Sequence, residues 1–249
     1  MKKVRLGLVA ILLIAAMQGI AQTKQVQPVQ QVWAGYFNQT RFTNKWGLWL
    51  DVQLRTKEDF VSEFSQAIFR PGLTYYLSDA AKLTVGYAYI HHFPADAHPK
   101  VAQPEHRPWQ QFQWHTKYKK LRTMQWVRLE ERYRQKIASP STLGKGYHFN
   151  FRVRYNLLVQ LPLTAKQTAK GGVSLIANNE VHLNFGKEVV YNTFDQNRAF
   201  FGLAYHLNAH DNIQFGYMNL YQQLAAGNRY RSLHAARVFY FHNLDLRKK

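Results

Sequence analysis

Apolar and polar side chains alternate with a period of two along most of the chain. In residues 147–161, every second residue from Tyr147 to Leu161 is apolar or aromatic, whereas six of the seven residues between them are polar. Neighbouring residues of a β-strand point to opposite faces, so the two sets lie on opposite faces of a sheet. The pattern predicts a strand with one apolar and one polar face.

The same alternation recurs, and eleven segments show it in all. Besides 147–161, clear copies cover residues 46–55, 66–77, 83–90, 123–132 and 198–207, and weaker copies cover 32–42, 109–118, 173–185, 213–221 and 233–244. Bacterial single-chain barrels have even strand numbers, and residues 22–30 are a candidate for one more strand. The prediction is therefore 10–12 strands.

The lengths of the predicted strands separate the possible architectures. Strands of soluble proteins have about 5–6 residues, whereas a strand that crosses a bilayer at a tilt needs about 9–11. Several of these segments have the longer length, and their apolar faces end in aromatic residues such as Trp46, Tyr75 and Tyr147, as interface girdles do. The pattern predicts an all-β protein: a closed antiparallel transmembrane β-barrel.

The connections between the predicted strands fall into two sizes. Short connections at residues 43–45, 78–81, 119–120 and 208–211 roughly alternate with longer ones at 56–63, 94–104, 135–146, 186–196 and 223–230. In outer-membrane barrels, short turns line one rim and long loops the other. Residues 164–172 are long for a turn and depart from the rule.

The N-terminus has the order of a secretory signal peptide. Three cations lie in the first five residues, an apolar run follows at 6–17, and the small residues Gly19 and Ala21 come next. An uncleaved anchor is the alternative, but this run is shorter than the roughly 20 residues of a spanning helix. We expect residues 1–21 to be removed by cleavage near Ala21 and residues 22–249 to form one barrel in a bacterial outer membrane.

Composition excludes several classes of protein. The chain has 249 residues, 33 Lys+Arg against 14 Asp+Glu, a net charge of +19, 15% aromatic residues and no cysteine. The aromatic content argues against disorder, and the lack of cysteine excludes a disulfide scaffold and a thiolate metal site. The basic residues are spread over the whole chain, so we expect outer-membrane lipid as the partner of rim cations, and not nucleic acid.

The polar faces suggest what fills the barrel. An Arg on the lipid face at the bilayer midplane costs about 2–4 kcal/mol, which directs the apolar faces to lipid and the polar faces to the lumen. The predicted lumen network consists of Arg55, Arg70, Glu105, Arg107, Gln111, Arg128, Glu130, Arg132, Arg152, Arg154, Glu180 and Arg198.

Two interpretations of this network stay open. Arg128, Glu130 and Arg132 share one strand face at a spacing of about 6.6 Å, so the side chains can form a ladder that plugs and rigidifies a narrow barrel. Alternatively, the excess of arginine lines a narrow pore that favours small anionic solutes.

The sequence gives little support for catalytic or metal-binding residues. Ser174, Glu180 and His182 share a strand face, but Ser174 and His182 lie about 26 Å apart along it, and no Gly-x-Ser-x-Gly motif is present. His91 and His92 are adjacent in a strand, so they point to opposite faces. We therefore expect no enzyme, no metal site and no cofactor; a barrel enzyme acting on lipid is the less favoured alternative.

Several polar-face motifs occur together in one order. They are Glu-His-Arg-Pro-Trp-Gln-Gln at 105–111, Arg-Leu-Glu-Glu-Arg at 128–132, Arg-Val-Arg-Tyr at 152–155 and Phe-Asp-Gln-Asn-Arg at 194–198, with Gly-Tyr turns at 85–87 and 215–217. With them the chain, from about Trp33 to its end, resembles the bacterial family called domain of unknown function 2490. The resemblance implies an outer-membrane barrel and supplies no catalytic or binding residue.

The rival fold is a soluble secreted β-barrel or sandwich with a ligand cavity. The two folds differ in where the arginines point. The membrane barrel requires guanidinium groups in a shared interior and apolar side chains on the outer wall, and arginines on the outer wall contradict it.

Overall fold

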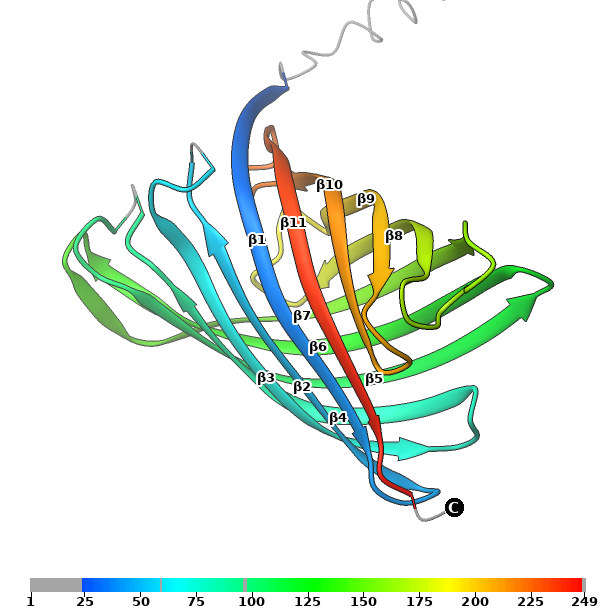
Figure 1. The fold of residues 1–249 in the computed structure, drawn as a ribbon. Coiled ribbons are helices and arrows are strands. Elements are labelled where there is room, and N and C mark those ends of the chain that lie inside the picture. The colour runs from blue at the N-terminus through cyan, green and yellow to red at the C-terminus, as the bar shows by residue number, and fades with distance from the viewer. Residues whose placement is uncertain (1–23, 59, 96–97, 248–249) are drawn as a thin grey trace, which may run out of the picture.

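The computed structural model describes residues 24–58, 60–95 and 98–247, and eleven β-strands account for most of them (Figure 1). The predicted signal peptide, residues 1–21, lies outside the described residues. The described ranges contain no helix long and apolar enough to cross a membrane. The strands are β1 (Gln25–Arg41), β2 (Trp46–Thr56), β3 (Phe64–Tyr76), β4 (Ala81–His92), β5 (Gln103–Tyr118), β6 (Leu121–Ser139), β7 (Thr142–Pro162), β8 (Val173–Phe185), β9 (Phe194–His206), β10 (Asp211–Gln223) and β11 (Arg229–Asp245).

The strands close into one barrel in sequence order. Each strand is antiparallel to the next in sequence, and β1 closes the barrel on β11 in parallel, from Gln25 opposite Arg229 to Arg41 opposite Asp245. The predicted closed all-β barrel of 10–12 strands is confirmed. The antiparallel prediction is wrong at this one seam, because an odd number of up-and-down strands leaves the first and last running in the same direction. Residues 25–30 belong to β1 and add no further strand.

The two ends of the barrel differ. At the loop end lie the start of β1 and the connections that follow the even-numbered strands; at the turn end lie the connections that follow the odd-numbered strands and the C-terminus (Figure 1). The predicted long loop at 135–146 is wrong, since β6 and β7 continue past two register irregularities to a turn at 140–141. The ten-residue connection at 163–172 does lie at the turn end.

Gly86 and Gly216, which were expected in turns, lie in the middle of strands. Gly72 and Gly86 face each other across β3 and β4, and a Cβ on Gly86 would lie 2.7 Å from the indole of Trp109. Gly202 and Gly216 form the same kind of pair across β9 and β10. The Gly-Tyr segments at 85–87 and 215–217 are therefore strand positions where glycine leaves room for a ring or a neighbouring strand.

The outer wall is apolar. Along β2 the exposed Leu48 and Val52 alternate with the buried Trp49, Asp51 and Gln53. Large apolar side chains are exposed around the whole barrel: Leu48, Val52, Phe69, Val85, Phe112, Val127, Phe151, Phe201, Phe215 and Val238. The orientation predicted from the alternation, with apolar side chains outward, is the one the structure has.

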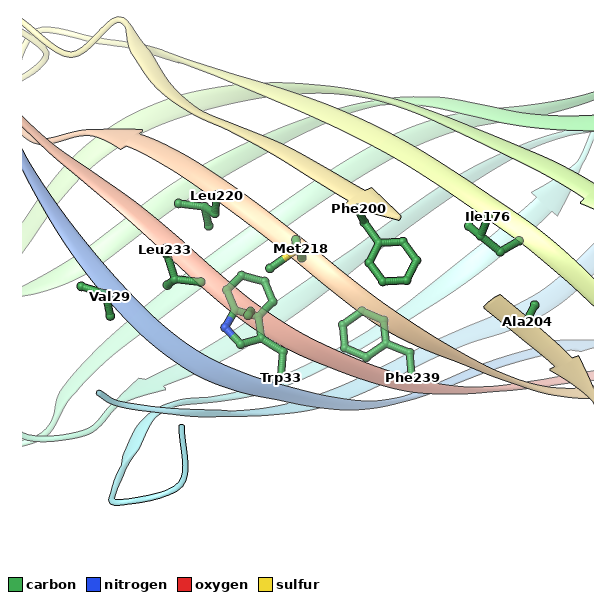
Figure 2. Close-up of a cluster of buried hydrophobic side chains, with 10 residues drawn as sticks. Val29, Trp33, Ile176, Phe200, Ala204, Met218, Leu220, Leu233 and Phe239 are labelled. Carbon is green, nitrogen blue, oxygen red and sulfur yellow. The ribbon is translucent and has the colours of Figure 1, made fainter. Parts of the chain in front are cut away.

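The interior has two chemically different walls. β1 and β8–β11 carry a buried apolar cluster on their inner face: Val29, Trp33, Ile176, Phe200, Ala204, Met218, Leu220, Leu233, Ala235 and Phe239 (Figure 2). A smaller cluster on β2–β5 includes Trp49, Ile68 and Trp109. The rest of the inner face, mainly from β2 to β9, carries charged and amide side chains.

Candidate functional site

All twelve side chains of the predicted lumen network lie on the inner face of the barrel. Eleven of them are buried, and the twelfth, Arg198, is half-buried. Alternation along the strands explains this placement, because it directs each polar residue of a two-faced strand to the same side of the wall.

Glu130 on β6 is the centre of one cluster of ion pairs. Its side chain is 0% exposed and accepts hydrogen bonds from Arg152 Nε at 2.9 Å and Nη2 at 2.5 Å and from Arg154 Nη1 at 2.6 Å. Arg107 Nη1 lies 3.4 Å away. Several guanidinium groups thus share one carboxylate.

Glu105 on β5 is the centre of a second cluster. Its Oε1 atom accepts from Arg107 Nη2 at 2.6 Å and from Arg132 Nε at 2.7 Å. Its Oε2 atom accepts from Arg134 Nε at 3.2 Å and lies 3.0 Å from His92 Nε2. Arg134 and His92 were not predicted, and both extend the cluster toward the loop end.

The short hydrogen bonds of the ladder residues on β6 go mainly to neighbouring strands. Arg128 Nη1 lies 3.9 Å from Glu130, beyond hydrogen-bonding distance, and Arg132 bonds Glu105 on the neighbouring strand instead. Directly paired residues on adjacent strands have Cβ atoms about 4.5–5.5 Å apart, closer than the roughly 6.6 Å between alternate residues of one strand. Glu130 is paired with Arg152 in this way.

Asp195 is a buried carboxylate whose inward direction could not be predicted from the alternation. The β8–β9 pairing shifts register between His182 and Leu183, which makes Asp195 an extra residue on β9, and both Asp195 and its neighbour Gln196 are buried on the inner face. Asp195 accepts a hydrogen bond from Arg152 Nη1 at 2.9 Å. A strict period of two allows only one of two adjacent residues to point inward, and a β-bulge breaks that rule.

Other buried arginines have neutral partners. Arg55 donates to Gln53 at 2.9 Å and to Gln66 at 3.0 Å, and its guanidinium lies 3.6 Å from the centre of the Trp33 ring. Arg128 donates to Gln111 at 2.9 and 2.6 Å. Trp33 is thus an inward platform for a cation.

Arg237 on β11 was not predicted as a lumen residue. Its guanidinium lies 3.3 Å from the centre of the Phe200 ring and 4.7 Å from that of Phe239. Among the described residues, five buried nitrogens of arginines that line the cavities have no hydrogen-bond partner: Arg55 Nε, Arg70 Nε, Arg128 Nη1, Arg231 Nε and Arg237 Nε. Such donors are available to a bound anion.

Two cavities occupy the lumen. The loop-end cavity has a volume of about 150 Å³ and is lined by nine arginines and, among the described residues, by no carboxylate. These are Arg55, Arg70, Arg107, Arg132, Arg134, Arg152, Arg154, Arg198 and Arg231. The turn-end cavity has about 370 Å³ and a mixed lining. The two meet at side chains that line both: Trp33, Gln53, Arg70, Arg154 and Arg198.

Three buried carboxylates lie behind the arginines of the loop-end cavity. Glu105, Glu130 and Asp195 contact the arginines that line the loop-end cavity without lining that cavity themselves. The other two of the five buried carboxylates, Asp51 and Glu180, line the turn-end cavity. Twelve arginines line one or both cavities, so positive charge dominates the lumen surface.

The residues considered for catalysis are arranged differently. Ser174 is fully buried, and its Oγ atom lies 3.3 Å from His206 Nε2 on β9 and 3.0 Å from Gln160 Nε2. His182 instead lies 2.8 Å from Glu180. The serine thus has a cross-strand histidine neighbour, but neither Ser174 nor His206 is among the described residues that line a cavity.

The two adjacent histidines have separate surroundings. His92 lies between Gln66 and Glu105 in the lumen, whereas the His91 ring packs against Phe93 with a centroid distance of 4.8 Å. Within the described ranges, no three His, Asp or Glu side chains are grouped so that they could hold a metal ion.

Fold and site together define a class: closed β-barrel proteins with an apolar outer wall and an arginine-lined interior. The chain belongs to the family described as "Protein of unknown function (DUF2490)", whose model matches residues 30–231. This confirms the resemblance found in the motifs.

Two other proteins are similar to this chain. An uncharacterised protein of Methylorubrum extorquens is 28% identical over 162 residues, which are 64% of this chain and 64% of that protein's own length. Among solved structures, a NanC porin matches with 12% identity and a TM-score of 0.48 over 81% of this chain and 93% of the porin.

Proposed function

We propose that this chain is a non-catalytic β-barrel of a bacterial outer membrane whose lumen takes up small anionic solutes. The membrane location is supported by the apolar outer wall, since a soluble barrel would expose such large side chains to water at a cost of about 25 cal/mol per Å². A lipocalin-like soluble barrel has the opposite arrangement, with its apolar side chains inside.

The loop-end cavity is the observation that carries the anion preference. Its nine arginines present guanidinium donors to the cavity, while the carboxylates that neutralise part of their charge lie behind them. Rings of Arg favour anions in pores. The ion-paired clusters fix the guanidinium groups in place, so a preorganised positive surface faces the solute.

A plugged interior is the second candidate. The clusters around Glu105 and Glu130 favour it, because their many short hydrogen bonds fix side chains of neighbouring strands inside a narrow barrel. Conduction separates the two functions.

The test is the reversal potential of the purified barrel in a planar bilayer under a KCl gradient. We expect a current that prefers chloride over potassium. The double variant Arg55→Gln, Arg231→Gln removes two charges whose Nε atoms have no partner, and it should move the permeability ratio toward one. Lys145→Gln removes an exposed charge on the β6–β7 hairpin and serves as the control. Absence of current in wild type would support the plugged interior, and a cation preference would overturn the proposal.

A further inference from the structure

We infer that the turn-end cavity is a binding site for an organic anion that has an aromatic or aliphatic body. This inference rests on the proposed function and deepens it: it names the class of anion. Four features carry it, namely the size of the cavity, its apolar side, its arginine donors without a hydrogen-bond partner and its contrast with the loop-end cavity.

The cavity is larger than a single inorganic ion requires. Its volume of about 370 Å³ compares with about 30 Å³ for one water in the liquid. Ligand pockets of proteins start at about 300 Å³. The cavity therefore has room for a one- or two-ring molecule.

One side of the cavity is built for apolar contact. Phe37 stacks on Phe241 with ring centres 4.8 Å apart and lies 4.9 Å from the ring of Phe239. Leu158 and Met218 also line the cavity. Phe239 and Met218 belong to the apolar cluster of the inner wall (Figure 2). A hydrated inorganic anion gains nothing from such a surface, whereas a ring or alkyl chain does.

Arginine donor atoms without a hydrogen-bond partner lie in the same cavity. Arg128 on β6 is 2% exposed and Arg237 on β11 is 7% exposed, and both line the cavity. Arg128 Nη1 and Arg237 Nε have no hydrogen-bond partner among the described residues. A buried donor without a partner is unfavourable, and a carboxylate or phosphate that accepts from it removes that cost.

The loop-end cavity lacks this combination. It has less than half the volume, and arginines make up much of its lining. It suits the attraction of any small anion, whereas the turn-end cavity can distinguish an anion by its body.

The experiment measures binding of 2-naphthoate to the full barrel in detergent micelles by isothermal titration calorimetry. 2-Naphthamide has the same body without the charge and also reports uptake by micelles; acetate has the charge without the body. We expect naphthoate to bind at least about tenfold more tightly than either, a difference of about 1.4 kcal/mol.

Three variants at two residues locate the site. Arg237→Met keeps the apolar stem and should weaken naphthoate binding about tenfold or more, whereas Arg237→Lys keeps the charge and should bind within a few-fold of wild type. Phe241→Ala should weaken naphthoate and leave acetate unchanged. The control, Lys120→Gln, removes an exposed charge at the turn end outside the cavity. Heat-modifiable gel mobility verifies that each variant is folded.

Each outcome decides the inference. Equal binding of naphthoate and naphthamide, or equal binding by Arg237→Met and wild type, overturns it. A chloride-selective current without naphthoate binding leaves the proposed function standing and removes this inference. Naphthoate binding without any anion-selective current supports this inference and removes the proposed function.

Discussion

Buried guanidinium groups are the dominant feature at the scale of single residues. Glu130 and Glu105 each accept hydrogen bonds from at least two arginines inside the barrel. Removing one member of a buried ion pair costs about 3–5 kcal/mol, because the remaining charges lose their partner in a low-dielectric interior. The carboxylates thus stabilise the fold, although they do not line the loop-end cavity.

Glu130→Gln is the prediction at this scale. Replacing the carboxylate leaves Arg152 and Arg154 without their shared counter-charge, so we expect the free energy of unfolding to fall by about 3–5 kcal/mol. Urea titration of the barrel in lipid vesicles, followed by tryptophan fluorescence, measures the change. Glu188→Gln is the matched control: its pair with His148 is largely exposed, so its loss should cost at most about 1 kcal/mol. Equal costs for the two variants would contradict the assigned role of Glu130.

At the scale of elements, the parallel seam between β1 and β11 is the unusual feature. Seventeen residue pairs join the two strands, as many as β1 has residues. Ala34 lies opposite Val238 in this register, and both side chains face outward. The seam therefore fixes which residues of the first and last strands are neighbours.

A cysteine pair tests that register. The chain has no cysteine of its own, so in the double variant Ala34→Cys, Val238→Cys no other thiol competes. Adjacent sheet positions are close enough for a disulfide. We expect oxidation to join the two positions in one chain, detected by mass spectrometry after digestion. In the control, Ala34→Cys is combined with His234→Cys, which lies four residues or about 13 Å along the strand. Cross-linking of the control, or none in the test pair, would refute the seam.

At the scale of the whole molecule, three surfaces have different chemistry: an apolar outer wall, a positively charged lumen and rims rich in lysine. Lys117, Lys119 and Lys120 are exposed together at the turn end, at and beside the connection of β5 and β6. A cation near an anionic lipid surface contributes about 1 kcal/mol.

Reversal of these three charges tests whether lipid is the partner of the rim. The triple Lys→Glu variant at 117, 119 and 120 should bind more weakly than wild type to vesicles that contain anionic lipid, by up to about 1 kcal/mol for each cation lost. A flotation assay measures the bound fraction. Zwitterionic vesicles provide the control, since there the two proteins should behave alike. An unchanged bound fraction on anionic vesicles would exclude the rim as a lipid contact.

The sequence by itself determined the strands, their faces and the direction of the arginines. Alternation is a local property: Tyr147 and Phe149 point one way and His148 the other whatever the strand pairs with. For this reason all twelve predicted lumen residues lie inside the barrel.

Only the tertiary structure decided the partners, the closure and the cavities. The pairing of Glu130 with Arg152 depends on register between strands, and the inward Asp195 depends on a bulge opposite β8. The lumen has an apolar and a charged wall because β11, with Arg237 and Phe239, closes against β1. This contact joins segments some 200 residues apart in the sequence. Such contacts depend on the closure of the sheet into a barrel, and a local sequence pattern does not encode this closure.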